Sequence, residues 1–279
     1  MVRKRPIVTA ELSINHLGMV NIAKSMVKSA KDSGASLIKI KCKDVDKYYE
    51  EEGKKWRNFN FKKYRRSLEL SSDDIKELTK YCQELNIGWF CTVHDLQGLD
   101  FIKQLKPAMY KVASMDSNND DLVNAVMDLC SEDKKPFVVS IGGKSEDFTD
   151  KLINKINHRN LTAYILHTVS IYPTPTGRSN INYIKTLKKY ESDSVKIGYS
   201  GHEEGCAATL LATTLGVSMI ERHFTLTRDY NIHHIKSGLI PEEFKRMCAL
   251  IDDIIREKNC GIIKCAAEED KFLKNRVYE

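Results

Sequence analysis

Two histidines stand at the carboxyl ends of two consecutive strand patterns, residues 195–202 and 218–223. Each pattern runs from apolar residues into a histidine, His202 in the first and His223 in the second, and one helix's length of sequence separates them. Parallel strands joined by a right-handed crossover lie side by side, and ligand sites in such folds form outside the carboxyl ends of the strands. A lone histidine there more often makes a capping hydrogen bond, but this pair, with other polar residues beside it, predicts a metal site.

Other strand patterns also end in polar residues that a hydrophobic core would not select. They include lysines and hydroxyl groups: Glu11, Lys39, Lys41, Thr92, Lys111, Ser114, Ser140, Ser170, Ser200 and Glu221. Ammonium groups supply charge and hydroxyl groups supply directed donors, so their convergence predicts a receptor for a phosphate or a phospho-carboxylate. Each lysine taken singly is more often a surface charge. Their shared position at strand ends favours the binding site.

Eight strand patterns alternate with eight helical patterns along the chain. The predicted strands are 7–14, 37–41, 88–92, 109–112, 136–140, 161–167, 195–200 and 219–224, and the predicted helices are 21–33, 72–86, 96–105, 120–130, 148–157, 180–190, 203–215 and 241–258. The strands are continuously apolar, which is typical of a parallel sheet buried on both faces. We therefore predict an α/β fold, a single TIM (βα)8 barrel over residues 1–279. The insertion 42–70 follows the second strand and should arch over the active face.

Composition excludes several other classes of protein. The net charge of +6 is mild and spread along the chain, so no nucleic-acid partner is implied, and the basic, aromatic segment 54–66 is better explained as a solvated surface excursion. The eight cysteines form no C-x-x-C pair, and no signal peptide or apolar run of membrane-spanning length is present. We expect a cytoplasmic protein with reduced thiols and no membrane partner.

Five segments resemble the signature blocks of the sialic acid (nonulosonate) synthases. They are Ala10-Glu-Leu-Ser-Ile-Asn-His-Leu-Gly18, Tyr110-Lys-Val-Ala-Ser114, Leu166-His-Thr-Val-Ser-Ile-Tyr-Pro-Thr-Pro175, Gly198-Tyr-Ser-Gly-His-Glu203 and Ile220-Glu-Arg-His-Phe-Thr-Leu-Thr-Arg228. The blocks follow the family's order. The resemblance implies a TIM barrel that condenses phosphoenolpyruvate with an open-chain amino sugar and releases phosphate by C–O cleavage, usually with manganese or another divalent ion. It also implies the branch that lacks the antifreeze-like (SAF) carboxyl-terminal domain.

The resemblance assigns a role to each matching position. It implies that phosphoenolpyruvate is bound by Lys39, Thr92, Lys111, Ser114, Ser140 and Ser200. His202 and His223 would bind the metal, Glu11 would be the acid or base, and Tyr172 and Asp116 would contact the sugar. The chemistry agrees, since a Lewis acid on the aldehyde oxygen stabilises the alkoxide that develops as the carbon–carbon bond forms. The structural alternative for Glu11 is an ion pair with a lysine at the barrel mouth.

Several positions on the sugar side depart from the family's pattern, among them Ser170, which stands where some members have asparagine and others serine or threonine. Lys41 stands where many members have glutamine, and His234 stands where an aspartate that binds the sugar is expected. We predict that both residues contact an altered, more anionic sugar. Without the additional domain, the segment 43–66 would supply the lid.

Two alternative functions compete with this interpretation. The first is a synthase of a shorter ulosonic acid, of the octulosonate or heptulosonate type, but those relatives have a cysteine metal ligand near the first strand and residues 11–15 contain none. The second is a catalytically idle barrel that binds a sugar or a partner protein, although the lysines and histidines of the site are intact. The metal could be manganese, cobalt or a magnesium-like ion. A homo-oligomer, most simply a dimer, is expected because such assemblies are common.

Overall fold

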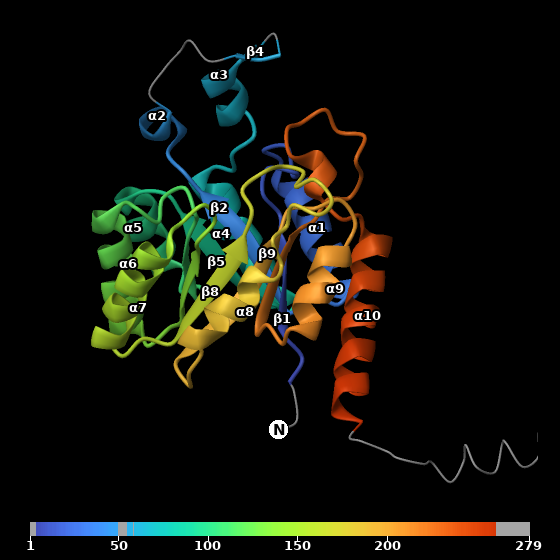
Figure 1. Ribbon diagram of the computed structural model, residues 1–279. Coiled ribbons are helices and arrows are strands. Elements are labelled where there is room, and N and C mark those ends of the chain that lie inside the picture. The colour runs from blue at the N-terminus through green and yellow to red at the C-terminus, as the bar shows by residue number, and fades with distance from the viewer. Residues whose placement is uncertain (1–3, 50–54, 58, 261–279) are drawn as a thin grey trace, which may run out of the picture.

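Eight parallel strands form a closed barrel in the computed structural model, which describes residues 4–49, 55–57 and 59–260. The barrel strands are β1 (Ile7–Glu11), β2 (Leu37–Cys42), β5 (Gly88–Val93), β6 (Tyr110–Val112), β7 (Phe137–Ser140), β8 (Ala163–Thr168), β9 (Val195–Gly201) and β10 (Met219–His223). The strands lie at the centre of the molecule (Figure 1). Their order around the barrel follows the chain, and β1 closes the ring by pairing with both β2 and β10. The predicted fold class is therefore confirmed.

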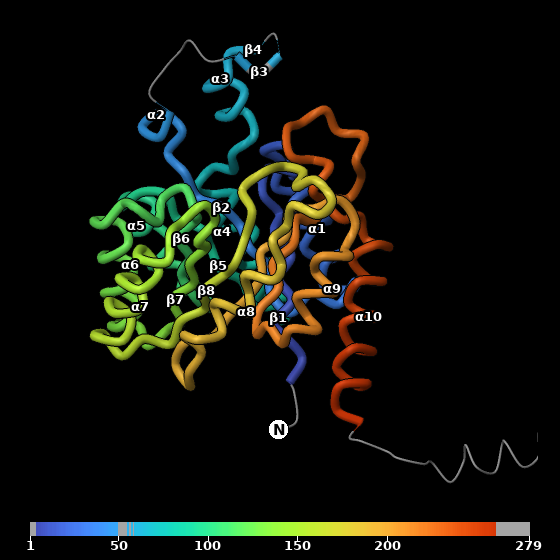
Figure 2. The backbone as a smooth tube through the Cα atoms, in the orientation of Figure 1, coloured from blue at the N-terminus to red at the C-terminus, as the bar shows by residue number. Residues whose placement is uncertain are grey.

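The helices surround the barrel and follow their strands in sequence (Figure 2). They are α1 (Val20–Asp32), α4 (Ser72–Glu84), α5 (Leu96–Gln104), α6 (Asp120–Asp133), α7 (Glu146–His158), α8 (Tyr183–Leu187), α9 (Ala207–Thr214) and α10 (Pro241–Asn259). Local sequence determines where several of these helices begin. Ser71 and Asp74 form a capping box at α4, and Pro241 opens α10 at a position where a missing N–H costs nothing. None of the described helices is long and apolar enough to cross a membrane.

A layer of apolar side chains forms the floor beneath the site. Phe90, Val138, Leu166 and Met219 pack together as a separate buried cluster. Each lies two residues before a polar strand-end residue, and alternate residues of a strand face the same side of the sheet. The interior of the barrel is thus filled by apolar groups below and carries polar groups above.

Short elements of two loops rise at the carboxyl ends of the strands. The segment after β2 holds α2 (Val45–Tyr48), the small antiparallel pair β3 (Lys55–Trp56) and β4 (Phe59–Asn60), and α3 (Phe61–Arg66). The loop between β10 and α10, which contains the 3-10 turn η2 (Ile235–Ser237), rises at the same end (Figure 1). The two loops touch, because the rings of Phe61 and His233 lie 5.8 Å apart.

Several predicted boundaries were wrong, including the end of the helix predicted over 120–130, which continues to Asp133. The first strand ends at Glu11 rather than at residue 14, because residues 12–18 turn, with Ser13 and Leu17 at positive φ. The helix predicted over 203–215 begins only at Ala207, and the one predicted over 180–190 is α8 followed by the 3-10 turn η1 (Lys188–Tyr190). Residues 261–279 lie outside the described residues, so the absence of a further domain stays a prediction.

Candidate functional site

A cavity of about 620 Å³ opens at the carboxyl ends of the strands, where the sequence predicted the site. Its described lining comprises Ser13, Lys39, Lys41, Lys43, Tyr49, Phe61, Arg65, Thr92, His94, Lys111, Ala113, Ser114, Met115, Ser140, Thr168, Ser170, Tyr172, Ser200, His202, Glu221, His223, His233 and His234. The structure thus brings together the predicted catalytic, substrate and metal positions, with two exceptions. Glu11 and Asp116 are not part of this lining.

Glu221 organises the inner half of the cavity. Its carboxylate accepts hydrogen bonds from Lys39 Nζ at 3.0 Å, from Lys111 Nζ at 2.6 Å to each oxygen, and from Ser200 Oγ at 3.0 Å. Burial alone would raise the pKa of Glu221, but the two ammonium groups lower that pKa below its usual range. The carboxylate is therefore ionised and holds both lysines at the cavity floor.

Glu11 lies behind Lys39. Its carboxylate forms an ion pair with Lys39, lies 3.7 Å from Lys41 Nζ, and accepts the backbone N–H of Ser13 at 2.9 Å. The side chain is fully buried. The ion pair considered at the sequence level is therefore present, and Glu11 contacts the cavity through its lysine partners.

His202 and His223 are neighbours, as their strand positions predicted. Their ring centroids lie 5.4 Å apart, and burial lowers the pKa of His202 to about 3 and that of His223 well below its usual value. His202 Nδ1 lies 2.8 Å from the carbonyl oxygen of Val169, which can only accept, so Nε2 retains its lone pair. The buried Nδ1 of His223 has no hydrogen-bond partner within the described chain.

This donor set fits a divalent cation bound in part by substrate. Two neutral imidazoles are suitable ligands for first-row metals, and the unpartnered nitrogen of His223 is a group that such an ion would satisfy. The described residues contain no group of three or more His, Cys, Asp and Glu side chains that could hold a metal. His202 and His223 would therefore need oxygen ligands from substrate or water to complete the coordination.

Arg222 anchors the segments that carry these histidines. It lies between Glu221 and His223 on β10, so its side chain points out of the barrel, where it is fully buried. Its Nη1 donates to Glu203 Oε1 at 2.9 Å, Gly205 O at 2.7 Å and Thr209 Oγ1 at 2.9 Å, and its Nη2 donates to the Glu203 carbonyl at 2.8 Å. This network ties β10 to the turn that follows His202.

The outer half of the cavity combines both loops. Tyr172 lies between two imidazoles, with ring centroids 4.0 Å from His202 and 4.0 Å from His234. Lys43 and Arg65 come from the segment after β2, and Arg65 Nη1 lies 3.1 Å from His233 Nε2. The predicted lid segment therefore contributes to the cavity wall.

Asp116 stands behind the wall of the cavity. It accepts hydrogen bonds from His94 Nδ1 at 2.7 Å and from the hydroxyl of Tyr48 at 2.9 Å. Burial lowers the pKa of His94 to about 3, so this ring is neutral. His94, rather than Asp116, lines the cavity.

Sequence reasoning left several lining residues without a role. Glu221 could have been assigned from its place two residues before His223, since alternate strand residues share a face. Lys43 and His94 carry the same signal, because each stands one residue past its strand and continues the alternation of the lining residues before it. Arg65 and His233 carry no comparable signal, because loop folding brings them to the cavity.

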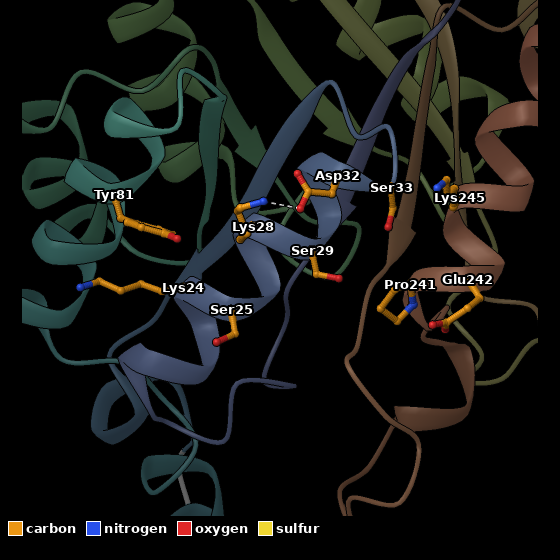
Figure 3. Close-up of a pocket in the computed structure, with 10 residues that line it drawn as sticks. All are labelled: Lys24, Ser25, Lys28, Ser29, Asp32, Ser33, Tyr81, Pro241, Glu242 and Lys245. Carbon is orange, nitrogen blue, oxygen red and sulfur yellow. Dashed lines mark hydrogen bonds and ion pairs between the residues drawn. The ribbon is translucent and has the colours of Figure 1, made fainter.

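A second cavity of about 630 Å³ lies on the outer helices rather than at the strand ends (Figure 3). It is lined by residues of α1 and α10 together with Tyr81 of α4. Two of its lysines are already paired, Lys24 with Glu77 and Lys28 with Asp32. The strand-end cavity is the stronger candidate for chemistry.

Comparison with known proteins places this chain among sugar-acid synthases. The sequence model of the NeuB family matches residues 26–262. An N,N'-diacetyllegionaminic acid synthase from Campylobacter jejuni is 28% identical over 97% of this chain and 82% of its own length. A pseudaminic acid synthase from the same species is 28% identical over 99% of this chain and 80% of its own length. A sialic acid synthetase structure from Leptospira borgpetersenii has the same fold, with a TM-score of 0.84 at 24% identity over 97% of this chain and 91% of that one.

Proposed function

Because the chain belongs to the NeuB family, we propose that it is a phosphoenolpyruvate-dependent sugar acid synthase. The reaction joins phosphoenolpyruvate to an open-chain aldose and water, and it yields a nonulosonic acid and inorganic phosphate. The observation that carries the proposal is one cavity in which Glu221 holds Lys39 and Lys111 beside the neutral pair His202 and His223.

The floor of the cavity suits an enol phosphate. Lys39 and Lys111 supply positive charge, and the hydroxyl groups of Thr92, Ser140 and Ser200 supply directed donors. Thr92 Oγ1 is buried and has no hydrogen-bond partner within the described residues, so a ligand oxygen would satisfy it. We infer that these groups, with Ser114, bind the phosphate and carboxylate of phosphoenolpyruvate.

The chemistry requires one bond to form and another to break. The methylene carbon of the enol attacks the aldehyde carbon, and the aldehyde oxygen takes a proton. Water then adds to the second carbon of the former enol and gives up both of its protons, one to balance the proton taken by the aldehyde oxygen and one to the departing phosphate, as that carbon's bond to the phosphate oxygen breaks to leave a 2-oxo acid. Holding the two carbons together removes most of the entropic part of the barrier. Bound at His202 and His223, a divalent cation such as manganese would supply a Lewis acid for the aldehyde oxygen.

Glu221 and Glu11 both act through the lysines of the cavity floor. Glu221 is the carboxylate that the described part of the cavity wall presents, and its ion pairs hold Lys39 and Lys111 in place to bind the enol phosphate. Glu11 acts through Lys39, whose ammonium group it contacts. In this proposal Tyr172, Lys41 and His234 contact the sugar, and Asp116 orients His94.

Purified protein tests the proposal directly. With manganese present, we expect phosphate to be released from phosphoenolpyruvate only when an aldose is added. The mass of the product should equal the mass of the aldose plus that of pyruvic acid. In water enriched in the heavy oxygen isotope, the released phosphate should stay unlabelled, because the C–O bond breaks. Absence of aldose-dependent release would support the idle barrel, and exclusive use of five-carbon aldoses would support the octulosonate type.

The cellular compartment and the oligomeric state of the protein are also part of the proposal. The seven cysteines within the described residues are free thiols, which agrees with a reducing cytoplasm. A homodimer also stays a prediction, and sedimentation analysis of the purified chain would test it.

A further inference from the structure

Charge is distributed unevenly over the cavity wall. Among the described lining residues five side chains are cationic, Lys39, Lys41, Lys43, Arg65 and Lys111, whereas Glu221 is the single carboxylate. Glu221 is already bound by Lys39 and Lys111 at the floor. The other three cations belong to the outer half, where the lining residues that the structure describes offer no anion.

The partners of these three cations leave their charge largely uncompensated toward the cavity. Within the described part of the chain, Lys43 Nζ contacts neutral groups: the hydroxyl of Tyr49 at 3.2 Å, and the rings of Tyr48 and Tyr49 at 3.7 Å and 5.0 Å from their centroids. Lys41 Nζ donates to Ser13 Oγ at 3.1 Å and lies 3.7 Å from Glu11, which Lys39 contacts more closely.

Arg65 has a carboxylate partner, but that partner stands outside the lining. Its Nη2 pairs with Glu69, and its Nη1 faces His233 at 3.1 Å. Asp116, an acidic residue behind the cavity wall, is engaged by His94 and Tyr48. No carboxylate therefore lies between Arg65 and the two lysines among the described lining residues.

The protonation of the lysines reflects this arrangement. Burial, followed by the neighbouring charge of Arg65, lowers the pKa of Lys43 to about 7 and that of Lys41 to about 8. Buried cations that repel each other are costly unless an anion joins them, and a bound anion would keep both lysines protonated.

We propose that the aldose used by this protein carries an acidic group, a phosphate or a carboxylate, that binds between Lys41, Lys43 and Arg65. The inference rests on the proposed synthase function and specifies its substrate class. The aldehyde must lie at the floor beside the enol phosphate, so the acidic group belongs to the opposite end of the sugar.

Matched pairs of aldoses test this inference. We would measure kcat/KM for phosphate release at saturating phosphoenolpyruvate and manganese with N-acetylmannosamine and its 6-phosphate, with mannose and mannuronic acid, and with a wider set of six-carbon aldoses. The acidic member of at least one pair should be preferred by tenfold or more, and the preferred pair distinguishes phosphate from carboxylate. Release with neutral members equal to or above their acidic partners would overturn the inference and leave the synthase function standing. No release with any aldose would overturn both.

Two lysine variants test where the acidic group of the aldose binds. Lys43→Met keeps the length of the side chain and removes its charge, so the ratio of kcat/KM for the acidic over the neutral aldose should fall at least tenfold. Lys24→Met on the outer surface of α1 is the matched control and should leave that ratio unchanged. An unchanged ratio in a folded Lys43→Met protein, as judged by circular dichroism, would contradict the assignment.

A labelling experiment gives a readout independent of turnover. Because burial lowers the pKa of Lys43 to about 7, a low concentration of an acylating reagent should modify this lysine early, as mass spectrometry of peptides would detect. The preferred acidic aldose should slow this modification at least several-fold, and its neutral partner should not. Equal protection by both sugars would argue against contact between Lys43 and the acidic group.

Discussion

Replacing Arg222 with methionine should destabilise the barrel where the candidate metal histidines are anchored. The guanidinium group is fully buried and donates four hydrogen bonds, including the ion pair with Glu203. Methionine keeps much of the volume and removes the charge, so Glu203 would be left buried without its counter-ion. Removing one partner of a buried ion pair costs about 3–5 kcal/mol. At roughly 2–4 °C per kcal/mol, the melting temperature should fall by about 6–20 °C.

A double-mutant cycle separates the lost charge pair from lost packing. Glu203→Gln alone should also destabilise, but the double variant Arg222→Met/Glu203→Gln should lose less than the sum of the two, by about 0.5–3 kcal/mol, since no buried charge is left alone. Chemical denaturation monitored by circular dichroism would give the free energies of unfolding of the wild type and the three variants.

An exposed ion pair provides the control for this cycle. Arg159 pairs with Asp128 at 2.7 Å near the surface, and Arg159→Met should cost less than about 1 kcal/mol. If Arg222→Met cost no more than Arg159→Met, or if the two buried substitutions were simply additive, the view that this network holds β10 to the turn after His202 would be refuted.

Three further outcomes follow from the site. Lys111→Met should lower kcat/KM for phosphoenolpyruvate by about 10–100-fold, since a charge-assisted hydrogen bond contributes roughly 1.5–3 kcal/mol, and steady-state kinetics would show it. His202→Ala should weaken manganese binding by at least tenfold in calorimetry, whereas wild-type affinity would remove this residue from the metal site. The ammonium form of Lys43 is the form that would bind the acidic aldose, so kcat/KM for that aldose should fall as the pH rises through about 7. The Lys43→Arg variant should move this fall to higher pH. An identical pH profile in that variant would exclude Lys43 as the titrating group.

The barrel could be predicted from sequence because its strands and helices have distinct hydrophobic patterns. The errors fall where tertiary contacts override those patterns. Leu12 and Ile14 continue the apolar run of β1, yet they belong to a turn, and Ile14 packs against Leu68 and Ile232 from the two loops. Glu203 suits a helix start, but Arg222 and Thr209 hold its carboxylate, and α9 begins four residues later.

The residues of the candidate site likewise divide into those that strand positions predict and those that loop folding determines. Lys39, Lys111 and His223 could be placed because the carboxyl ends of parallel strands meet at one rim of the barrel. The contribution of Arg65 could not, since its approach to the cavity depends on how the loop after β2 folds against the loop before α10. Nothing in residue spacing indicates that Asp116 would turn away from the cavity to hold His94.

The separation between rigid strands and an overlying loop has an evolutionary consequence. Groups proposed to handle the enol phosphate lie on the wall of a closed barrel, whereas Lys43 and Arg65 belong to a segment that can be exchanged without breaking a strand pair of that barrel. Such modularity lets sugar preference diversify while the reactive machinery is inherited intact. Grafting residues 43–71 from one relative onto another is accordingly the natural route to redirecting which sugar the barrel elongates.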